Sequence, residues 1–535
     1  MNQLYYGDNL TVLRNDISSE SVDLVYLDPP FNSQANYNVM FQSPAGEKSH
    51  AQIEAFGDTW HWGDEAEQAF DEVVHSGNTD AAELLRALRS FLKENDMMAY
   101  LAMMAIRLIE LHRVLKDTGS IYLHCDPTAS HYLKLLMDAV FGVRNFKTEI
   151  VWKRSSAHSD AKQGRKQHGR IHDVLFFYTK SEDKHTWNQL YTPYDQQYVD
   201  DFYRHIEPTT GRRYRLGDIT GPGGAAKGNP SYEVMGVTRY WRYSKTTMED
   251  LIAQGRIIQT NPGAVPAYKR YLDEMPGVPL QDVWSDINPI GAQAQERLGY
   301  PTQKPIALLE RIINASSNEG DTVLDPFCGC GTAVHASEKL KRDWIGIDIT
   351  HLAISLIEKR LNDAFPGIKY VVHGTPKDLE GARALASQDK YQFQWWAVSL
   401  VNAVPFGGKK KGADSGIDGL IYFKPEGKTT EKAIVSVKGG ENVNVAMVRD
   451  LAHVVDREKA KIGVFITLAD STGPMRTEAV KAGYYETLYG KYPKIQILTI
   501  EDLFTGKQPN IPLVDSASFK KAARESTEEN LDLPF

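Results

Sequence analysis

One stretch of this sequence restricts the fold more than any other: an apolar strand that runs into a glycine turn and then a helix. It covers residues 323–332 and reads Val-Leu-Asp-Pro-Phe-Cys-Gly-Cys-Gly-Thr. Glycines at such a turn let backbone N–H groups approach a ligand closely, and the helix N-terminus favours an anionic group. No Lys precedes Thr332, so a triphosphate loop is not indicated. We therefore predict an open α/β fold that binds a carboxylate, such as that of a methionine moiety.

Two acidic residues suit the same ligand. Asp348 ends the next predicted strand, where an acidic side chain can bind two ribose hydroxyls. Asp325 can pair with an ammonium group. Cys328 and Cys330 flank the turn, but the only other cysteine is Cys125 and no set of histidines accompanies them. We interpret them as small residues that line a turn, and not as metal ligands.

A second strand, residues 22–27, ends at the tetrapeptide Asp28-Pro29-Pro30-Phe31. Open α/β sheets place their chemistry at the carboxyl ends of strands. The Asp28 carboxylate and the Pro29 carbonyl can both accept N–H bonds from an exocyclic base amine, which turns its lone pair towards a methyl donor. Pro30 fixes that carbonyl without adding a donor, and Phe31 offers a face for stacking the base. Such a base must be flipped out of the duplex.

The rest of the first 375 residues alternates helices and strands. The apolar stripe Met97, Leu101, Met104, Leu108, Leu111 and Leu115 predicts a helix that ends at Gly119. Further predicted elements are a strand at 120–124, helices at 130–140 and 305–316, a strand at 322–324, a helix after Gly331 and a strand at 344–347. Periodicity is lost between about Ser155 and Pro289. Further strands are predicted at 434–437, 463–467 and 495–500.

The predicted fold class is α/β: a Rossmann-like domain with an inserted region, followed by a smaller α/β domain. The expected boundaries are 1–154 for the catalytic half of the first domain, 155–290 for the insert, and 291–375 for the cofactor-binding half. The smaller domain is expected at 390–510 and a flexible tail at 511–535.

Together, the tetrapeptide and the glycine loop resemble those of the amino-methyltransferases of bacterial and phage DNA. The tetrapeptide precedes the loop, as in their permuted "beta" order. Gly7-Asp8-Asn9 resembles the family's segment near the cofactor adenine, and the stretch 302–305, Thr-Gln-Lys-Pro, resembles the one that completes the methionine pocket. Asp-Pro-Pro-Phe is more similar to the adenine-N6 members than to the cytosine-N4 members.

This resemblance implies a Rossmann-like methyltransferase domain, a target-recognition role for the insert at 155–290, and S-adenosylmethionine as cofactor. It also assigns residues to two roles. The implied catalytic residues are Asp28, Pro29, Pro30 and Phe31. The implied cofactor-binding residues are Asp8, Thr302, Lys304, Pro305, Asp325, Phe327, Gly329, Gly331, Thr332 and Asp348.

Two basic clusters lie at the start of the predicted insert and within it, and the second is interleaved with Tyr214, Tyr240, Trp241 and Tyr243. The first basic cluster comprises Lys153, Arg154, Lys162, Arg165, Lys166 and Arg170, and the second comprises Arg212, Arg213, Arg215, Arg239 and Arg242. Basic and aromatic side chains together suit phosphate contacts and base stacking. The residues expected to bind DNA are Lys153, Arg154, Arg165, Lys166, Arg170, Arg239 and Arg242.

The C-terminal unit resembles the restriction-endonuclease fold. Asp418 precedes one strand, and Ser436 and Lys438 lie on the next. In that fold such positions hold Mg²⁺ and activate a water. Ser436 departs from the pattern, because an acidic residue or Gln is expected there. Gln394 or Asp414 can complete the site, and both cleavage and DNA binding without cleavage remain open.

Three cysteines and the absence of an apolar span or an export signal favour a cytoplasmic protein without a membrane partner. The net charge of −8 argues against an overall basic nucleic-acid coat but allows a local DNA-binding face. The expected partner is double-stranded DNA with a flipped base, and a second copy of the chain or a restriction subunit are further candidates. Alternatives are cytosine-N4 methylation, a combined restriction-modification enzyme, a non-catalytic DNA-binding protein, and an RNA substrate.

Overall fold

The computed structural model describes most of the chain. The described residues are 1–30, 61–155, 166, 168–291, 294–298, 300, 302–406, 416–425, 429–512 and 525, with the backbone of 36–42 and 48–57. They divide into two compact units. The first comprises Met1–Asn188 and Asp282–Ser526, and the second contains Gln189–Gln281.

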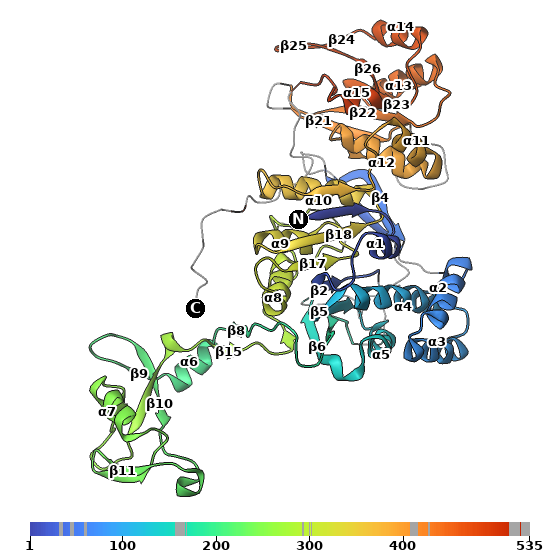
Figure 1. The fold of residues 1–535 in the computed structure, drawn as a ribbon. Helices are drawn as coiled ribbons and strands as arrows, with labels where there is room; N and C mark the ends of the chain where they lie inside the picture. Colours follow the sequence, from blue (N-terminus) through green and yellow to red (C-terminus); the bar gives the residue numbers. More distant parts are fainter. Residues whose placement is uncertain are drawn as a thin grey trace. The chain divides into compact units, whose positions relative to one another are not determined.

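A nine-stranded sheet forms the centre of the first unit (Figure 1). Its order is β16-β6-β7-β5-β2-β17-β18-β1-β19, and β7 alone runs antiparallel to its neighbours. The strands are β1 (Gln3–Tyr6), β2 (Val22–Leu27), β5 (Leu115–Cys125), β6 (Phe146–Lys153), β7 (His172–Thr179), β16 (Val283–Trp284), β17 (Thr322–Asp325), β18 (Asp343–Asp348) and β19 (Val371–His373). This arrangement confirms the predicted Rossmann-like α/β class.

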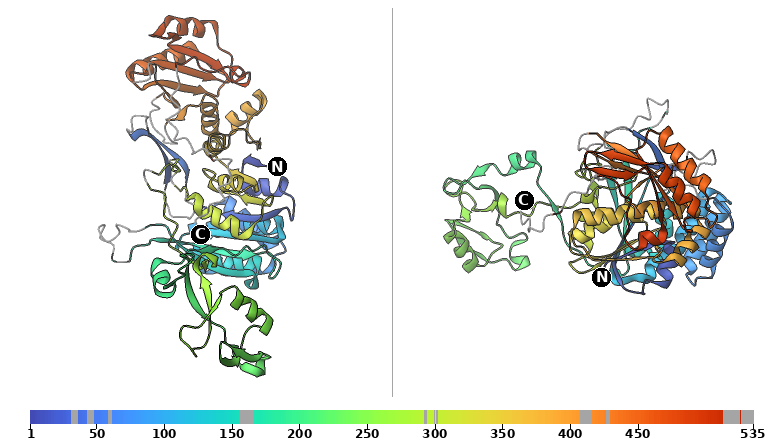
Figure 2. Two further views of the ribbon diagram at one scale, coloured as in Figure 1. Left: turned by 90° about the vertical axis from the view of Figure 1, so that its left-hand side faces the viewer. Right: turned by 90° about the horizontal axis from the view of Figure 1, so that it is seen from above.

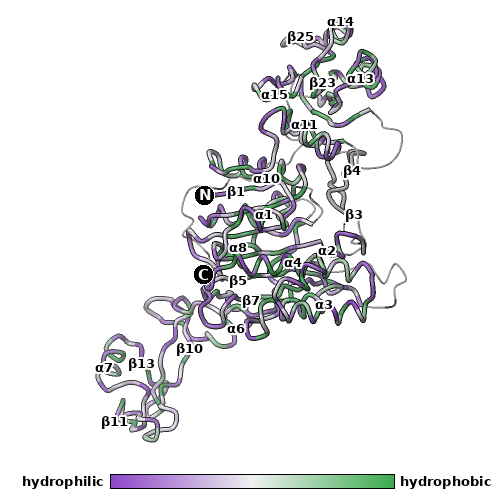
Figure 3. Tube along the Cα trace, turned by 45° about the vertical axis from the view of Figure 1, so that its right-hand side comes forward, coloured by the Kyte–Doolittle hydropathy of each residue, from purple (hydrophilic) through white to green (hydrophobic). Residues whose placement is uncertain are grey.

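Helices cover both faces of this sheet (Figures 1 and 2). One core joins alternate sheet residues such as Tyr5 and Ile345 to α1 (Asn9–Asn15), α3 (Thr79–Leu92), α4 (Asp96–Val114) and α5 (Ser130–Phe141). The other joins their neighbours Leu4 and Trp344 to α9 (Thr332–Lys339) and α10 (His351–Ala364). Helix α2 (Asp64–His75) packs on α4, and α8 (Ile306–Ser316) on α9. Hydrophobic residues concentrate along strands such as β5 and β7 and the adjoining α4 (Figure 3).

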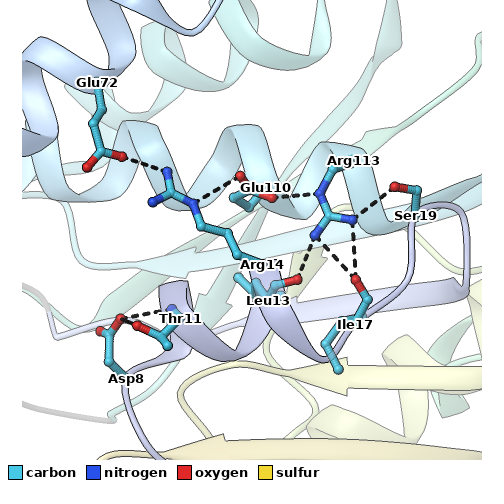
Figure 4. A network of polar contacts seen from close by, with 9 residues as sticks. All are labelled: Asp8, Thr11, Leu13, Arg14, Ile17, Ser19, Glu72, Glu110 and Arg113. Carbon is cyan, nitrogen blue, oxygen red and sulfur yellow. Dashed lines mark hydrogen bonds and ion pairs between the residues drawn. The ribbon is translucent and has the colours of Figure 1, made fainter.

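A polar network fixes α1 against α4 and α2 (Figure 4). Arg14 donates to Glu72 at 2.6 Å and to Glu110 at 3.2 Å. Arg113 also binds Glu110, at 2.6 Å, and donates to the carbonyl oxygen of Leu13 at 2.6 Å. The last turn of α1 is thereby fixed against both helices.

The predicted strands and helices of this unit are confirmed, but Gly119 does not end a helix. Helix α4 ends at Val114, and β5 begins directly at Leu115. The pairing of β2 with β5 shifts between Leu115 and Ser120, so the residues between them form a bulge. A Cβ on Gly119 would lie 2.7 Å from the Leu115 side chain, which explains a glycine at this bulge.

The central sheet takes β7 from the segment assigned to the insert, 155–290. The compact second unit is shorter, Gln189–Gln281. It contains the helices α6 (Gln196–Phe202) and α7 (Lys245–Ala253) and the four-stranded sheet β13-β14-β10-β9 (Ile257–Ile258, Ala267–Tyr271, Arg213–Asp218 and His205–Ile206). Two antiparallel pairs complete it: the hairpin of β11 (Ser231–Val234) with β12 (Val237–Tyr240), and β8 (Tyr191–Thr192) with β15 (Val278–Pro279). Its own core surrounds Trp241.

The C-terminal part of the first unit is a five-stranded sheet, β20-β21-β22-β23-β26. These strands are Val404–Pro405, Gly419–Phe423, Glu431–Lys438, Ile462–Thr467 and Ile495–Thr499. One face packs on α13 (Val445–Arg457) and α14 (Gly473–Lys481), and the other on α11 (Leu379–Gln388), α12 (Lys390–Leu400) and α15 (Ile500–Phe504). Two further strand pairs lie outside these sheets. They are β24 (Tyr484–Thr487) with β25 (Gly490–Pro493), and β3 (Asn36–Gln42) with β4 (Lys48–Gly57).

No helix in the described part of the chain is both long and apolar enough to span a membrane.

Candidate active site

The site lies at the topological switch point of the sheet, where the chain connections on one side run in the opposite direction to those on the other. The parallel neighbours β2 and β17 meet at this point, and a cavity of about 240 Å³ lies there. The loops after β1, β2, β17 and β18 all line it. Predicted site residues among the lining are Asp8, Asp28, Pro29, Pro30, Thr302, Lys304, Asp325, Phe327, Gly329, Thr332 and Asp348. Asp28, Pro29 and Pro30 thus face the same cavity as the glycine loop, which lies far away in the sequence.

Asp28 is paired with a lysine that the sequence places far away. Its Oδ2 lies 2.6 Å from Lys304 Nζ, and the two side chains are 16% and 11% exposed. Lys304 belongs to the stretch expected to complete the methionine pocket, yet its ammonium binds the predicted catalytic carboxylate. Lys304 therefore joins the two halves of the site.

Two further carboxyl groups of the cavity are strongly affected by burial. Burial raises the pKa of Asp348 to about 6, although hydrogen bonds from the N–H groups of Thr350 and Gly329 favour its ionised form. Burial also raises the pKa of Asp325 well above its usual range, and the nearby charge of Asp28 acts in the same direction. A cationic ligand group beside Asp325 would therefore favour its ionised form.

The glycine loop is shaped by two left-handed residues. Gly329 has φ +52°, and a Cβ there would lie 3.2 Å from the ring of Tyr300, which lines the cavity. Gly331 has φ +73° and caps the N-terminus of α9, where a Cβ would lie 2.8 Å from the Ile357 side chain. Buried Arg360 stabilises the loop by donating to the Cys330 carbonyl oxygen at 3.0 Å.

Asp8 and Asn9 connect the cavity to α4. Asp8 caps α1 through a hydrogen bond from the Thr11 N–H, and its other oxygen lies 2.9 Å from Arg107 Nη2. Asn9 donates to the Pro326 carbonyl oxygen at 2.9 Å and accepts from Arg107 Nε at 2.6 Å. A buried arginine thus ties the segment predicted near the cofactor adenine to the glycine loop.

The other predicted site residues lie as follows. Pro305 is buried at the start of α8 and, like Gly331, is not among the described residues that line the cavity. Phe31 lies outside the described residues. Cys125, Cys328 and Cys330 are buried and unpaired by disulfides. Within the described ranges, no cluster of three His, Cys, Asp or Glu side chains is arranged to hold a metal.

The first basic cluster is only partly available for a ligand. Lys153, Lys166 and Arg170 are exposed. Arg154 is 37% exposed, and its Nε lies 3.2 Å from Asp173. Arg165 falls outside the described residues.

In the second unit, most of the predicted cationic side chains are paired within the unit itself. Arg212 binds Asp273 and Glu274, Arg213 binds Asp200, and Arg242 lies 3.6 Å from Asp218. Arg239, on the exposed strand β12 beside Tyr240, has no ion pair to a described residue. The interleaved aromatic residues serve structure as well, since Trp241 is fully buried.

The C-terminal residues come together in part. The Asp418 carboxylate accepts from the Val437 N–H at 2.6 Å, so it lies beside β22 between Ser436 and Lys438. Ser436 is buried. Gln394 lies on α12, and Asp414 is outside the described residues.

Several site residues escaped sequence reasoning. Tyr26, Arg107 and Tyr300 line the cavity. A charged residue within the apolar stripe of α4 is a signal that could have identified Arg107, because a buried charge requires a partner. No comparable signal identifies Tyr300.

Comparison with known families agrees with this geometry. A family model described as DNA methylase, of the N6/N4 type, matches residues 22–359, more than half of the chain. A restriction endonuclease family model matches residues 385–503.

Individual relatives point the same way. The type II methyltransferase M.EcaI of Enterobacter cloacae is 28% identical over 363 residues, 67% of this chain and 69% of that protein. The Mod subunit of the type III restriction-modification enzyme StyLTI of Salmonella typhimurium is 26% identical over 354 residues, 63% of this chain and 50% of that protein. The DNA adenine methyltransferase YhdJ of Escherichia coli is 25% identical over 361 residues, 68% of this chain and 83% of that protein.

Proposed function

This chain belongs to the N6/N4 DNA methylase family and carries a restriction-endonuclease-like domain, and from that premise we propose that it methylates the exocyclic N6 amine of adenine in DNA. The observation that carries the proposal is a single cavity lined by both Asp28-Pro29-Pro30 and the glycine loop. One motif suits an amine acceptor and the other suits a cofactor, so the two reactants would meet there.

S-adenosylmethionine fits the chemistry of the cavity, and when bound it supplies an electrophilic methyl group. Asp348, at the end of β18, would accept bonds from its ribose hydroxyls. Asp325 and the start of α9 would hold its ammonium and carboxylate groups, respectively. Asp8, Thr302, Phe327, Gly329 and Thr332 would complete the walls, with Lys304 between this site and Asp28.

The target amine would be held by the tetrapeptide. Asp28 and the carbonyl oxygen of Pro29 would accept its two N–H bonds, so the nitrogen lone pair turns away from the ring. Pro30 would fix the direction of that carbonyl, and Phe31 would stack on the base. A flipped base is required because the amine is paired inside the duplex.

Adenine is preferred over cytosine in this proposal for two reasons. Asp28 begins the tetrapeptide that resembles the adenine-N6 members, and YhdJ, named a DNA adenine methyltransferase, is similar along most of its length. Cytosine-N4 methylation is the alternative on the same scaffold.

The DNA would be double-stranded and would be contacted by both units. In the first unit, exposed Lys153, Lys166 and Arg170 suit phosphate contacts. In the second unit, Gln189–Gln281 would read the target sequence, with Arg239 and Arg242 near the DNA. A restriction subunit or a second copy of the chain would be a further partner, and such an enzyme would work in the cytoplasm, where cellular DNA lies.

Product analysis tests the proposed base. Unmethylated genomic DNA is incubated with S-adenosylmethionine and the protein, digested to nucleosides and separated by mass spectrometry. N6-methyl-2′-deoxyadenosine is expected, and Asp28→Ala should abolish it. N4-methylcytosine instead would establish the alternative, and no methylated base from folded, cofactor-binding protein would contradict the proposal.

DNA cleavage by the C-terminal domain is a second candidate function. It is favoured by the match to a restriction endonuclease family and by the position of Asp418 beside Lys438. The described side chains supply one carboxylate there and a buried serine at the second position, which does not by itself fit Mg²⁺. We therefore derive no metal-dependent step, and DNA binding without cleavage is equally compatible.

Plasmid nicking separates these outcomes. Cleavage that requires Mg²⁺ and is lost in Asp418→Ala and Lys438→Ala would support a nuclease. If the wild type binds the plasmid but does not nick it, the domain would be assigned a binding role.

A further inference from the structure

One buried positive charge lies behind the wall of the cavity. Arg360, on α10, is 2% exposed. Its Nη1 donates to the Cys330 carbonyl oxygen at 3.0 Å and to Thr332 Oγ1 at 3.2 Å, and both of these residues line the cavity. Arg360 itself is not among the described residues that line it. The guanidinium group therefore supports the wall that the glycine loop and the start of α9 form.

This charge has no close counter-charge in the described part of the chain. No described carboxylate forms an ion pair with Arg360, and its Nε has no hydrogen-bond partner there. Burial lowers the pKa of Arg360, and Glu296 and Glu525 oppose this only from further away. Cys330 Sγ lies 3.9 Å from Nη1, but burial raises the pKa of this thiol, so it is neutral. A guanidinium group stays charged inside a protein, so the positive charge of Arg360 is buried without an ion pair.

Holding the loop in place does not require a charge. Pro326, in the same loop, is held by the neutral amide of Asn9, which donates to its carbonyl oxygen at 2.9 Å. Burying a charge without a carboxylate partner is much more costly than burying a hydrogen-bonded amide. A role in shaping the loop therefore explains the hydrogen bonds of Arg360 but not its charge.

The cationic side chains of the cavity lining differ from Arg360 in this respect. They are Lys304 and Arg107. Lys304 Nζ lies 2.6 Å from Asp28, and Arg107 Nη2 lies 2.9 Å from Asp8. Both lining cations are thus matched by carboxylates of the protein itself, whereas the cation behind the wall is not.

The hydrogen bonds of Arg360 direct its charge to the start of α9. Thr332 and Ala333 are the first two residues of this helix, and both line the cavity. N–H groups at the start of a helix lack intrahelical acceptors and carry partial positive charge. A positive charge held behind them in a poorly solvated interior adds to their effect. An anionic ligand group at the start of α9 would therefore supply the counter-charge that Arg360 lacks.

We propose that Arg360 is a positioning residue for the cofactor, whose buried charge stabilises the cofactor's carboxylate at the start of α9. The inference rests on the proposed function, in which S-adenosylmethionine binds in this cavity. It assigns a role to a residue outside the motifs that carry the family resemblance. It also makes Arg360 a determinant of specificity, because only ligands with a carboxylate benefit from its charge.

Two ligands that differ only in the carboxylate test this role. S-adenosylmethionine and its decarboxylated form share the adenosine, sulfonium and ammonium groups. Isothermal titration calorimetry gives the dissociation constant of each ligand for the full-length protein. The carboxylate preference is the constant of the decarboxylated form divided by that of S-adenosylmethionine. Arg360→Gln keeps an amide donor but no charge, and it should lower this preference about tenfold, as expected for coupled neighbouring groups.

Further variants separate the charge of Arg360 from its structural contacts. Arg360→Lys keeps the charge and should hold the carboxylate preference within about threefold of the wild type. Arg360→Met is a second variant without the charge, should Arg360→Gln fail to fold. Arg342→Gln is the matched control, because Arg342 is also buried and donates to the carbonyl oxygens of Leu340 and Ser317 at 2.6 and 2.8 Å, outside the glycine loop. Arg342→Gln should lower the thermal midpoint and leave the carboxylate preference unchanged.

A purely structural role for Arg360 predicts that both ligands weaken equally. An unchanged carboxylate preference in folded Arg360→Gln or Arg360→Met, or a preference in Arg360→Lys as low as in Arg360→Gln, would overturn the inference. An equal fall in Arg342→Gln would overturn it as well. Failure of the wild type to bind S-adenosylmethionine would overturn the inference and the proposed function together, whereas binding without methyl transfer to DNA would contradict the proposed function alone.

Discussion

At the scale of single residues, the acidic side chains of the cavity differ in how burial affects their charge. Asp348 has a pKa of about 6, within reach of ordinary assay conditions. Its carboxylate is the proposed acceptor for ribose hydroxyls, and a protonated carboxyl group accepts these bonds less well. Cofactor affinity should therefore fall towards acidic pH as Asp348 protonates, and Asp325, whose pKa burial also raises, should act in the same direction.

The sign of this dependence follows from the raised pKa. Above about pH 7 Asp348 is ionised and the dissociation constant for S-adenosylmethionine should be constant. Below about pH 6 the constant should rise by up to about tenfold per pH unit as Asp348 protonates. Isothermal titration calorimetry between pH 5 and 8 measures it, and Asp348→Asn should bind weakly with a smaller rise, which Asp325 alone would cause. An affinity that improves towards acidic pH would contradict the assignment.

Residue positions were predictable where a motif carries them. Asp28, Asp325 and Asp348 were each placed at a strand end by the sequence, and all line one cavity. The pairing of Lys304 with Asp28 was not predictable, because 276 residues separate them and a surface lysine has the same sequence signature. The contact of the Tyr26 hydroxyl with His124 was not predictable either, because 98 residues separate the two side chains.

At the scale of elements, two glycines before and after β17 illustrate two different reasons for a glycine. Gly331 has φ +73° and a Cβ would meet Ile357 at 2.8 Å. Gly320 has φ +83°, but nothing lies within 4 Å of its Cβ position. The two residues share a backbone conformation and differ only in packing.

Gly331→Ala should therefore destabilise the protein more than Gly320→Ala. Each substitution pays about 1–2 kcal/mol for its left-handed conformation, and Gly331→Ala adds about 1–3 kcal/mol of overpacking against α10. Urea unfolding measures the difference. Gly331→Ala should also weaken binding of S-adenosylmethionine, which Gly320→Ala should leave intact. Equal loss of stability in the two variants would show that α10 yields at this contact.

Regular elements were predictable from periodicity, and irregular ones were not. Strand β2 and helix α5 match their apolar patterns closely. The bulge at Gly119 was mistaken for a helix end, because a glycine after an apolar stripe is a common stop signal. The second unit was read only as irregular, since several of its strands contain two residues and bury few side chains.

At the scale of the whole molecule, the endonuclease-like domain packs against the cofactor half of the methyltransferase domain. Trp395, on α12, joins a buried cluster with Tyr300, Leu352 and Leu356. Gln392, also on α12, accepts from the His351 N–H at the start of α10. Because Tyr300 also lines the cavity, the two domains share a wall of the proposed cofactor site.

Trp395→Ala should therefore weaken S-adenosylmethionine binding by removing support behind Tyr300. Trp396→Ala is the matched control, because Trp396 is buried in the domain's own core. Both variants should destabilise the C-terminal domain, and only Trp395→Ala should lower cofactor affinity, by about tenfold for roughly 1.4 kcal/mol of lost support. An equal effect of the two variants on affinity would show that Tyr300 does not depend on this contact.

The central claim is that the cavity between β2 and β17 transfers a methyl group to DNA, with Asp28 holding the amine. Its most direct test is the rate of label transfer from radioactive S-adenosylmethionine to unmethylated DNA by the wild type and by Asp28→Ala, at saturating cofactor. Label should enter DNA with the wild type and fall to background with Asp28→Ala, while both proteins bind the cofactor with similar affinity. Undiminished transfer by Asp28→Ala would contradict the account, because the amine would then be held elsewhere.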